Sequence, residues 1–124
     1  MTPEAKHLIT KYKGAGRKLG IEEAAIIVNN YVTRHELTEY QYGALVSFVD
    51  NRGAQAFYQS KLLKIINEDF YPDWELRASK EFDKPCWCVW LGKYNKSMAI
   101  RRAKEKRLFL TPLLVVHNVP ETKR

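Results

Sequence analysis

The stretch TEYQYGALVSFVDNRG, residues 38–53, carries its own helix start and stop. Thr38 and Gln41 have the spacing of a capping box, in which each side chain accepts a hydrogen bond from the backbone of the other residue. Apolar side chains follow at helical spacing as far as Asn51-Arg52-Gly53, which is a typical helix end. The stretch therefore predicts a helix with one buried face.

Helical patterns continue on both sides of this stretch. Thr2 can cap a helix that has Pro3 at its first position, and Ile21 to His35 has apolar residues at helical spacing. On the other side, the same spacing runs from Ala54 to Ile66, before Tyr71-Pro72 forces an extended chain. We expect about four N-terminal helices.

The pattern changes after Pro72. Residues alternate between apolar and polar from Trp74 to Ala78, and Cys86 to Leu91 is apolar on both faces, which is typical of a central strand. Leu113 to Val116 predicts another strand, with Pro112 placing its start at an edge or bulge. The expected fold class is α+β, with the N-terminal helices packed on a small, mainly antiparallel C-terminal sheet.

Length and hydropathy set the domain organisation. A chain of 124 residues can close one hydrophobic core, so we expect a single α+β domain over residues 1–119 and a flexible tail over residues 120–124. No apolar run approaches the roughly 18 residues that cross a bilayer, and the N-terminus lacks the pattern of a secretory signal. A cytoplasmic protein is the expectation.

Positive charge is concentrated in the C-terminal part. Residues 1–75 hold 9 Lys/Arg against 10 Asp/Glu, a balance of −1, whereas residues 76–124 hold 12 against 4, a balance of +8. A basic surface of this size attracts nucleic acid, DNA or RNA, or an acidic protein surface, before any specific contact forms.

The most basic window runs from Lys96 to Arg107, and its pattern permits either a helix or a strand leading into a hairpin. A helix is favoured, because Ala99 and Ala103 are good helix formers and cations are stabilised at the C-terminal end of a helix. The residues predicted to contact phosphates are Arg101, Arg102, Lys104, Lys106 and Arg107, with Lys93, Tyr94 and Lys96 at the rim.

These features favour a small, basic, non-enzymatic nucleic-acid-binding or regulatory protein that contacts phosphates through its C-terminal basic segment. The alternative is a protein-binding inhibitor or adaptor, of the kind encoded by viruses and plasmids, that blocks an acidic or nucleic-acid-binding surface of a partner. If each charge reversal in Arg101 to Arg107 weakens binding by a similar amount, phosphate binding is favoured. If one or two side chains account for most of the binding energy, a protein interface is favoured. No catalytic residue and no cofactor is predicted.

A metal-dependent nuclease is the third hypothesis. Asp73 and Glu75 are followed by Lys80, Glu81, Asp83 and Lys84, and acidic residues with a nearby lysine could hold a divalent cation and activate water. No other metal site is expected, because the histidines lack paired ligand spacing.

The remaining motifs predict structure more than function. The helices Ile21 to His35 and Thr38 to Asn51 resemble a helix-turn-helix unit, but the second offers Glu39, Tyr40 and Gln41 where a reading helix presents cations or amides. The Gly14–Gly20 segment is expected to be a flexible connection, from which Arg17 and Lys18 could still contact a polyanion. Cys86 and Cys88 are expected to be free thiols in a core strand.

Overall fold

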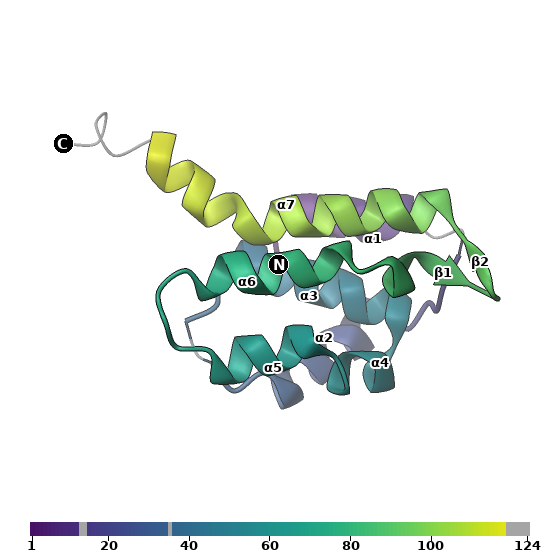
Figure 1. Ribbon diagram of the computed structural model, residues 1–124. Coiled ribbons are helices and arrows are strands. Elements are labelled where there is room, and N and C mark those ends of the chain that lie inside the picture. The colour runs from purple at the N-terminus through teal and green to yellow at the C-terminus, as the bar shows by residue number, and fades with distance from the viewer. Residues whose placement is uncertain (13–14, 35, 119–124) are drawn as a thin grey trace.

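The long helix α3 (Glu39–Arg52) lies at the centre of the fold (Figure 1). The computed structural model describes residues 1–12, 15–34 and 36–118. The predicted capping box is confirmed, since Thr38 Oγ1 accepts from the Gln41 backbone at 3.1 Å and Gln41 Oε1 accepts from the Thr38 backbone at 3.0 Å. Nearly every residue of α3 from Gly43 to Asn51 is buried, so the helix has neighbours on all sides and not on one face only.

Two N-terminal helices pack against α3, as the helical pattern predicts. They are α1 (Pro3–Lys11), capped by the Thr2 hydroxyl, and α2 (Ile21–Tyr31). The α1–α3 contact is close because Gly43 has no side chain: a Cβ built there would lie 2.5 Å from the Ala5 Cβ. The predicted continuation of α2 to His35 is wrong, since Val32 is already extended, and His35 itself lies outside the described residues.

The helix expected from Ala54 to Ile66 is two helices, α4 (Ala54–Tyr58) and α5 (Lys61–Glu68). The break falls at Ser60, whose hydroxyl accepts a hydrogen bond from the Leu63 backbone at 3.1 Å and so caps α5. A serine that bonds its own backbone in this way competes with helix continuation.

The strand predicted at Trp74 to Ala78 is wrong, because these residues begin α6 (Trp74–Lys80). Trp74 and Ala78 are both buried and lie four residues apart, so one helix face carries both into the core. Five residues that alternate between apolar and polar fit one face of a short helix as well as they fit a strand. Two 3₁₀ turns follow, Glu81–Asp83 and Pro85–Cys88, so Cys86 and Cys88 do not lie in a core strand.

The sheet has two short antiparallel strands, β1 (Val89–Trp90) and β2 (Lys93–Tyr94). The expected mixture of helices with an antiparallel sheet is therefore confirmed at the level of fold class. However, the described chain contains seven α-helices, not about four, and they pack on one another while the hairpin projects from one end (Figure 1). Of the predicted central strand Cys86 to Leu91, only Val89 and Trp90 form a strand, β1.

The helix predicted over Lys96 to Arg107 is confirmed as part of α7 (Lys96–Asn118). The side chain of Asn95 accepts from the Met98 backbone at 2.9 Å and marks the helix start. Because α7 continues through Leu113 to Val116, the strand predicted there is wrong. Residues 120–124, expected to form a flexible tail, lie outside the described part of the chain.

Aromatic rings fill the core between α3, α7 and the segment that joins α6 to the hairpin. The Phe48 ring of α3 meets Trp87 and Phe82 edge to face, at centroid distances of 5.1 and 5.9 Å. Phe82 continues the contact to Phe109 of α7 at 5.7 Å. Such pairs hold the hairpin end against the helices. None of the described helices combines the length and the apolarity that crossing a bilayer requires.

Candidate functional site

Arg101 and Arg102, two of the five residues predicted to contact phosphates, are buried in the protein. Arg101 is 1 % exposed and Arg102 is 2 % exposed. Both point into the core from α7, where a nucleic acid cannot reach them. The prediction that these two residues contact phosphates is therefore wrong.

The Arg101 guanidinium joins three parts of the chain. It donates to the Ser47 carbonyl at 2.7 Å and pairs with the Asp50 carboxylate at 3.0 Å, and both of these residues lie on α3. It also donates to the Tyr12 carbonyl at 2.9 Å, just after α1. Asp50 in turn accepts from the Gly20 backbone at 2.8 Å. The arginine therefore fixes the end of α1 and the start of α2 to α3.

Glu105 completes this buried network. Its carboxylate is 0 % exposed and pairs with Arg102 at 2.7 Å and with Arg101 at 3.3 Å, and it also accepts from the Ser47 hydroxyl. Burial is the main reason that the pKa of Arg102 lies below its usual value, and Glu105 partly offsets the lowering. Two arginines against Glu105 and Asp50 leave the network close to neutral, as burial demands.

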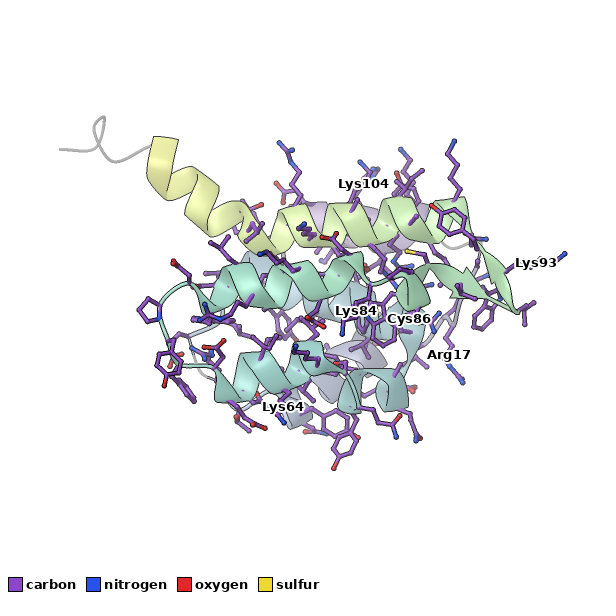
Figure 2. All side chains as sticks on the ribbon, viewed as in Figure 1. Arg17, Lys64, Lys84, Cys86, Lys93 and Lys104 are labelled. Atoms are coloured by element: carbon purple, nitrogen blue, oxygen red, sulfur yellow. The ribbon has the colours of Figure 1, made fainter. Side chains whose placement is uncertain are left out.

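The other residues of the predicted phosphate site do not form one cluster. Lys93, Tyr94, Lys104 and Arg107 are exposed. Lys93 lies on the hairpin at one end of the molecule, whereas Lys104 lies on the outer side of α7 (Figure 2). Lys106 pairs with Asp83 at 2.5 Å. Lys96 is exposed at the first turn of α7.

A hollow of about 650 Å³ opens where the segment before α2 meets α4 and the hairpin. Two guanidinium groups and one indole contribute to its wall, those of Arg17, Arg52 and Trp90. Gln55 and Gln59 add amide groups, and the remaining lining residues are Leu19, Glu23, Ile27, Gly53, Ala54 and Ala56. This volume falls in the range of pockets that hold small ligands.

The helix end at Gly53 brings the two arginines together. Gly53 has a φ of 91°, which disfavours a side chain, and a Cβ there would lie 2.7 Å from the Arg17 Cδ. The Arg17 stem therefore lies directly over the backbone that follows Arg52. Arg52 itself donates to the Val89 carbonyl at 3.1 Å, with its guanidinium 5.6 Å from the Trp87 ring centre. The hairpin thus positions Arg52.

A second hollow, of about 560 Å³, adjoins the first and shares Leu19 and Glu23 with it. Its carboxylates are those of Glu22, Glu23 and Asp50. Glu22 and Glu23 are exposed to water, whereas Asp50 is buried and held by Arg101. Residues between 17 and 23 line both hollows. Together the two hollows form a polar surface that carries charges of both signs.

Sequence reasoning found only part of this surface. It noted that Arg17 could contact an anion, and it treated the Gly14–Gly20 segment as a flexible connection. Gly20 instead donates to Asp50, and Arg17 donates its backbone N–H to Asn51, so the described part of this segment is bonded to α3. Arg52 and Trp90 were missed, since no short-range pattern relates them to Arg17.

The described residues of the hypothetical metal site do not assemble into a group of metal ligands. Asp73 precedes α6 in a left-handed conformation, with a φ of 66°, and Glu75 lies within the helix. Lys84 pairs with Glu81 at 2.9 Å. Over the described residues, no group of three or more potential metal ligands comes together.

Comparisons with known proteins identify the class to which this fold and surface belong. The family model described as phage lysozyme matches residues 4–105, which include both hollows and the Arg101 network. The chain belongs to the phage lysozyme family.

Two of the matching proteins illustrate the resemblance. It is 38 % identical over 80 residues to the protein named endolysin of Bacillus phage PZA; the match covers 64 % of this chain but 29 % of that relative's length. A solved structure, the muramidase domain of SpmX from Asticaccaulis excentricus, superposes with a TM-score of 0.70 at 25 % identity. That match covers 90 % of this chain and 97 % of the solved one.

These findings correct the functional hypotheses from the sequence. A phage lysozyme match over most of the chain, with an endolysin and a muramidase domain as relatives, contradicts a nucleic-acid-binding or regulatory protein. It equally contradicts an inhibitor that docks on an acidic partner, and a metal-dependent nuclease. Charge balance misled the prediction because it counts Arg101 and Arg102, which the fold buries in ion pairs.

Proposed function

We propose that this protein acts on the peptidoglycan of bacterial cell walls, as a muramidase-type domain that engages the glycan strands. Membership of the phage lysozyme family over residues 4–105 is the observation that carries the proposal. The names of its relatives, an endolysin and a muramidase domain, support the same substrate. The activity of the whole protein is part of this proposal, because the chain spans 29 % of the length of the endolysin relative.

The surface around residues 17–23 suits a glycan. Saccharides are bound through amide and charged groups that hydrogen-bond hydroxyls and through aromatic faces that pack against the ring. The first hollow offers Gln55, Gln59 and Trp90 in these roles. The buried network around Arg101 keeps the site in place, since it ties the end of α1 and the start of α2 to α3.

Cleavage of a glycosidic bond requires two carboxyl groups, one of which is kept as an acid by an apolar setting. Two buried carboxylates, Asp50 and Glu105, are already paired with arginines inside the protein. Glu22 and Glu23 line the second hollow but are exposed to water. We therefore place glycan binding at the first hollow and take Glu23, which lines both hollows, as the residue to test for cleavage.

The test uses purified peptidoglycan sacculi. The protein is mixed with sacculi and centrifuged, and the bound fraction and the released reducing ends are both measured. Saturable pelleting with sacculi is the expected result, and its absence would contradict the proposal. If reducing ends are released, the Glu23→Gln variant should lose that release while it still pellets; unchanged release would remove Glu23 from the reaction.

A further inference from the structure

Arg17 and Arg52 place two positive charges beside one hollow that holds a single carboxylate, that of Glu23. Arg17 is exposed and Arg52 is half-buried, and both line the hollow. Within the described part of the chain, neither forms an ion pair. The other basic side chains near carboxylates, such as Arg77 and Lys106, do form such pairs. Exposed lysines such as Lys64 and Lys93 also form no ion pair among the described residues, so what distinguishes the two arginines is that both line one hollow.

The two charges also act on each other. Burial is the main reason that the pKa of Arg52 lies below its usual value; Cys86 opposes this lowering, and the neighbouring charge of Arg17 adds to it. Arg52 Nε is buried and has no hydrogen-bond partner among the described residues. Like charges held together in this way raise the free energy of the empty site, and an anion bound between them lowers it.

Arginine favours a planar anion. A guanidinium presents two parallel N–H donors that match the two oxygens of a carboxylate, and this pairing is stronger than a neutral hydrogen bond. Trp90 lies on the same wall and offers an apolar face. An acidic ligand with a sugar ring beside its carboxylate would use both features at once.

The single carboxylate on the wall limits how much negative charge the hollow accepts. Glu23 lines the same hollow, so the local balance is two positive charges against one negative. A ligand with one carboxylate neutralises this excess, whereas a highly charged polyanion would also meet Glu23. The balance therefore favours a saccharide that carries isolated carboxylates.

We infer that Arg17 and Arg52 bind a carboxylate of an acidic saccharide, and that they make this hollow select acidic over neutral glycans. The inference rests on the proposed action on peptidoglycan and names the feature of that glycan which the site recognises. The carboxylate can come from the lactyl group of the acidic sugar or from the attached peptide. Both sources share the same chemistry at the arginine pair.

The experiment is calorimetric titration of the full chain with three ligands at moderate ionic strength. The ligands are a peptidoglycan disaccharide–peptide, the same disaccharide with a free lactyl carboxylate and no peptide, and a neutral chitin oligosaccharide. Binding of at least one acidic ligand about tenfold tighter than the neutral one is expected, since a charge-assisted contact contributes about that factor. The two acidic ligands distinguish the peptide from the sugar as the source of the carboxylate.

Variants connect this selectivity to the arginine pair. Arg17→Ala, at an exposed position, should lower the affinity for the acidic ligand about tenfold and lower the affinity for the neutral ligand much less. Lys64→Ala is the matched control, because it removes one exposed positive charge from α5, at a position that does not line this hollow and lies apart from Arg17 in Figure 2. Arg52→Lys keeps the charge but loses the paired donors, so it should weaken acidic binding only in part.

The outcomes separate the two proposals. Equal binding of acidic and neutral glycans, or an Arg17→Ala variant that behaves like Lys64→Ala, would overturn the arginine assignment and leave glycan binding intact. No binding of any of the three ligands, together with no pelleting on sacculi, would overturn the proposed function itself. The pelleting assay does not depend on the arginine pair being the site of recognition.

Discussion

Replacing Glu105 with alanine should strongly destabilise the protein. Glu105 is 0 % exposed, and its carboxylate pairs with Arg102 at 2.7 Å and with Arg101 at 3.3 Å. Without it, Arg101 keeps Asp50, but the main described partner of Arg102 is the Trp87 carbonyl at 3.4 Å. Removing one partner of a buried ion pair costs about 3–5 kcal/mol, because the charge left behind has no compensation.

Urea denaturation measures this change. With an m-value of about 2 kcal/mol/M, a loss of about 4 kcal/mol moves the midpoint down by about 2 M. The matched control is Glu36→Ala, since the Glu36 side chain is 70 % exposed and lies 3.5 Å from Arg34. Removing this exposed carboxylate should cost less than about 1 kcal/mol, because Arg34, whose side chain is 5 % exposed, still donates to the Ile66 and Asp69 carbonyls.

A double variant separates lost charge from lost packing. In Arg102→Met with Glu105→Leu, apolar side chains replace the pair, and Arg101 keeps Asp50 at 3.0 Å. Because apolar replacement of a buried pair is often neutral, the double variant should recover at least half of the stability that Glu105→Ala loses. If Glu105→Ala loses no more stability than Glu36→Ala, or if the double variant is no better than the single one, the reasoning is refuted.

Three further predictions concern other parts of the chain. Gly43→Ala should destabilise by about 1–3 kcal/mol, because its Cβ would lie 2.5 Å from that of Ala5; a denaturation midpoint equal to wild type would contradict the close packing. The hydrogen bond from the Arg77 guanidinium is the main cause that lowers the pKa of Asp69 below its usual value of 3.8. The ionised Asp69 therefore stabilises the folded protein above that pH, and this contribution is lost as the pH falls through the lowered pKa. Compared with Asp69→Asn, wild type should lose more stability from about pH 5 towards about pH 2, and parallel acid denaturation curves would argue against it. Cys86 is exposed, whereas burial raises the pKa of the Cys88 thiol, so a thiol reagent should modify Cys86 first in the folded protein; equal rates would contradict this difference.

The central helix could be predicted from sequence because its signals are local. The capping box at Thr38 and Gln41 and the stop at Gly53 lie within one short segment, and the structure confirms them. The strands predicted at Trp74 to Ala78 and Leu113 to Val116 are wrong because segments of four or five residues fit either period. Packing against the helical core decides such cases, and sequence alone does not show that packing.

The candidate site depends on contacts between distant segments. Arg101 and Asp50 are 51 residues apart, and Arg17 lies against the backbone next to Arg52 because Gly53 has no side chain. One local signal was present: Glu105 lies three and four residues after the two buried arginines, at the spacing of helical ion pairs. That spacing indicates pairing within the protein and argues against a free cationic surface.

The most direct test of the proposed action on peptidoglycan is saturable binding to purified sacculi, compared with the same mass of cellulose, which is a neutral glycan. We expect the protein to pellet with sacculi to a plateau and to pellet far less with cellulose. Failure to pellet with sacculi, or equal pelleting with both polymers, would contradict recognition of the bacterial cell wall.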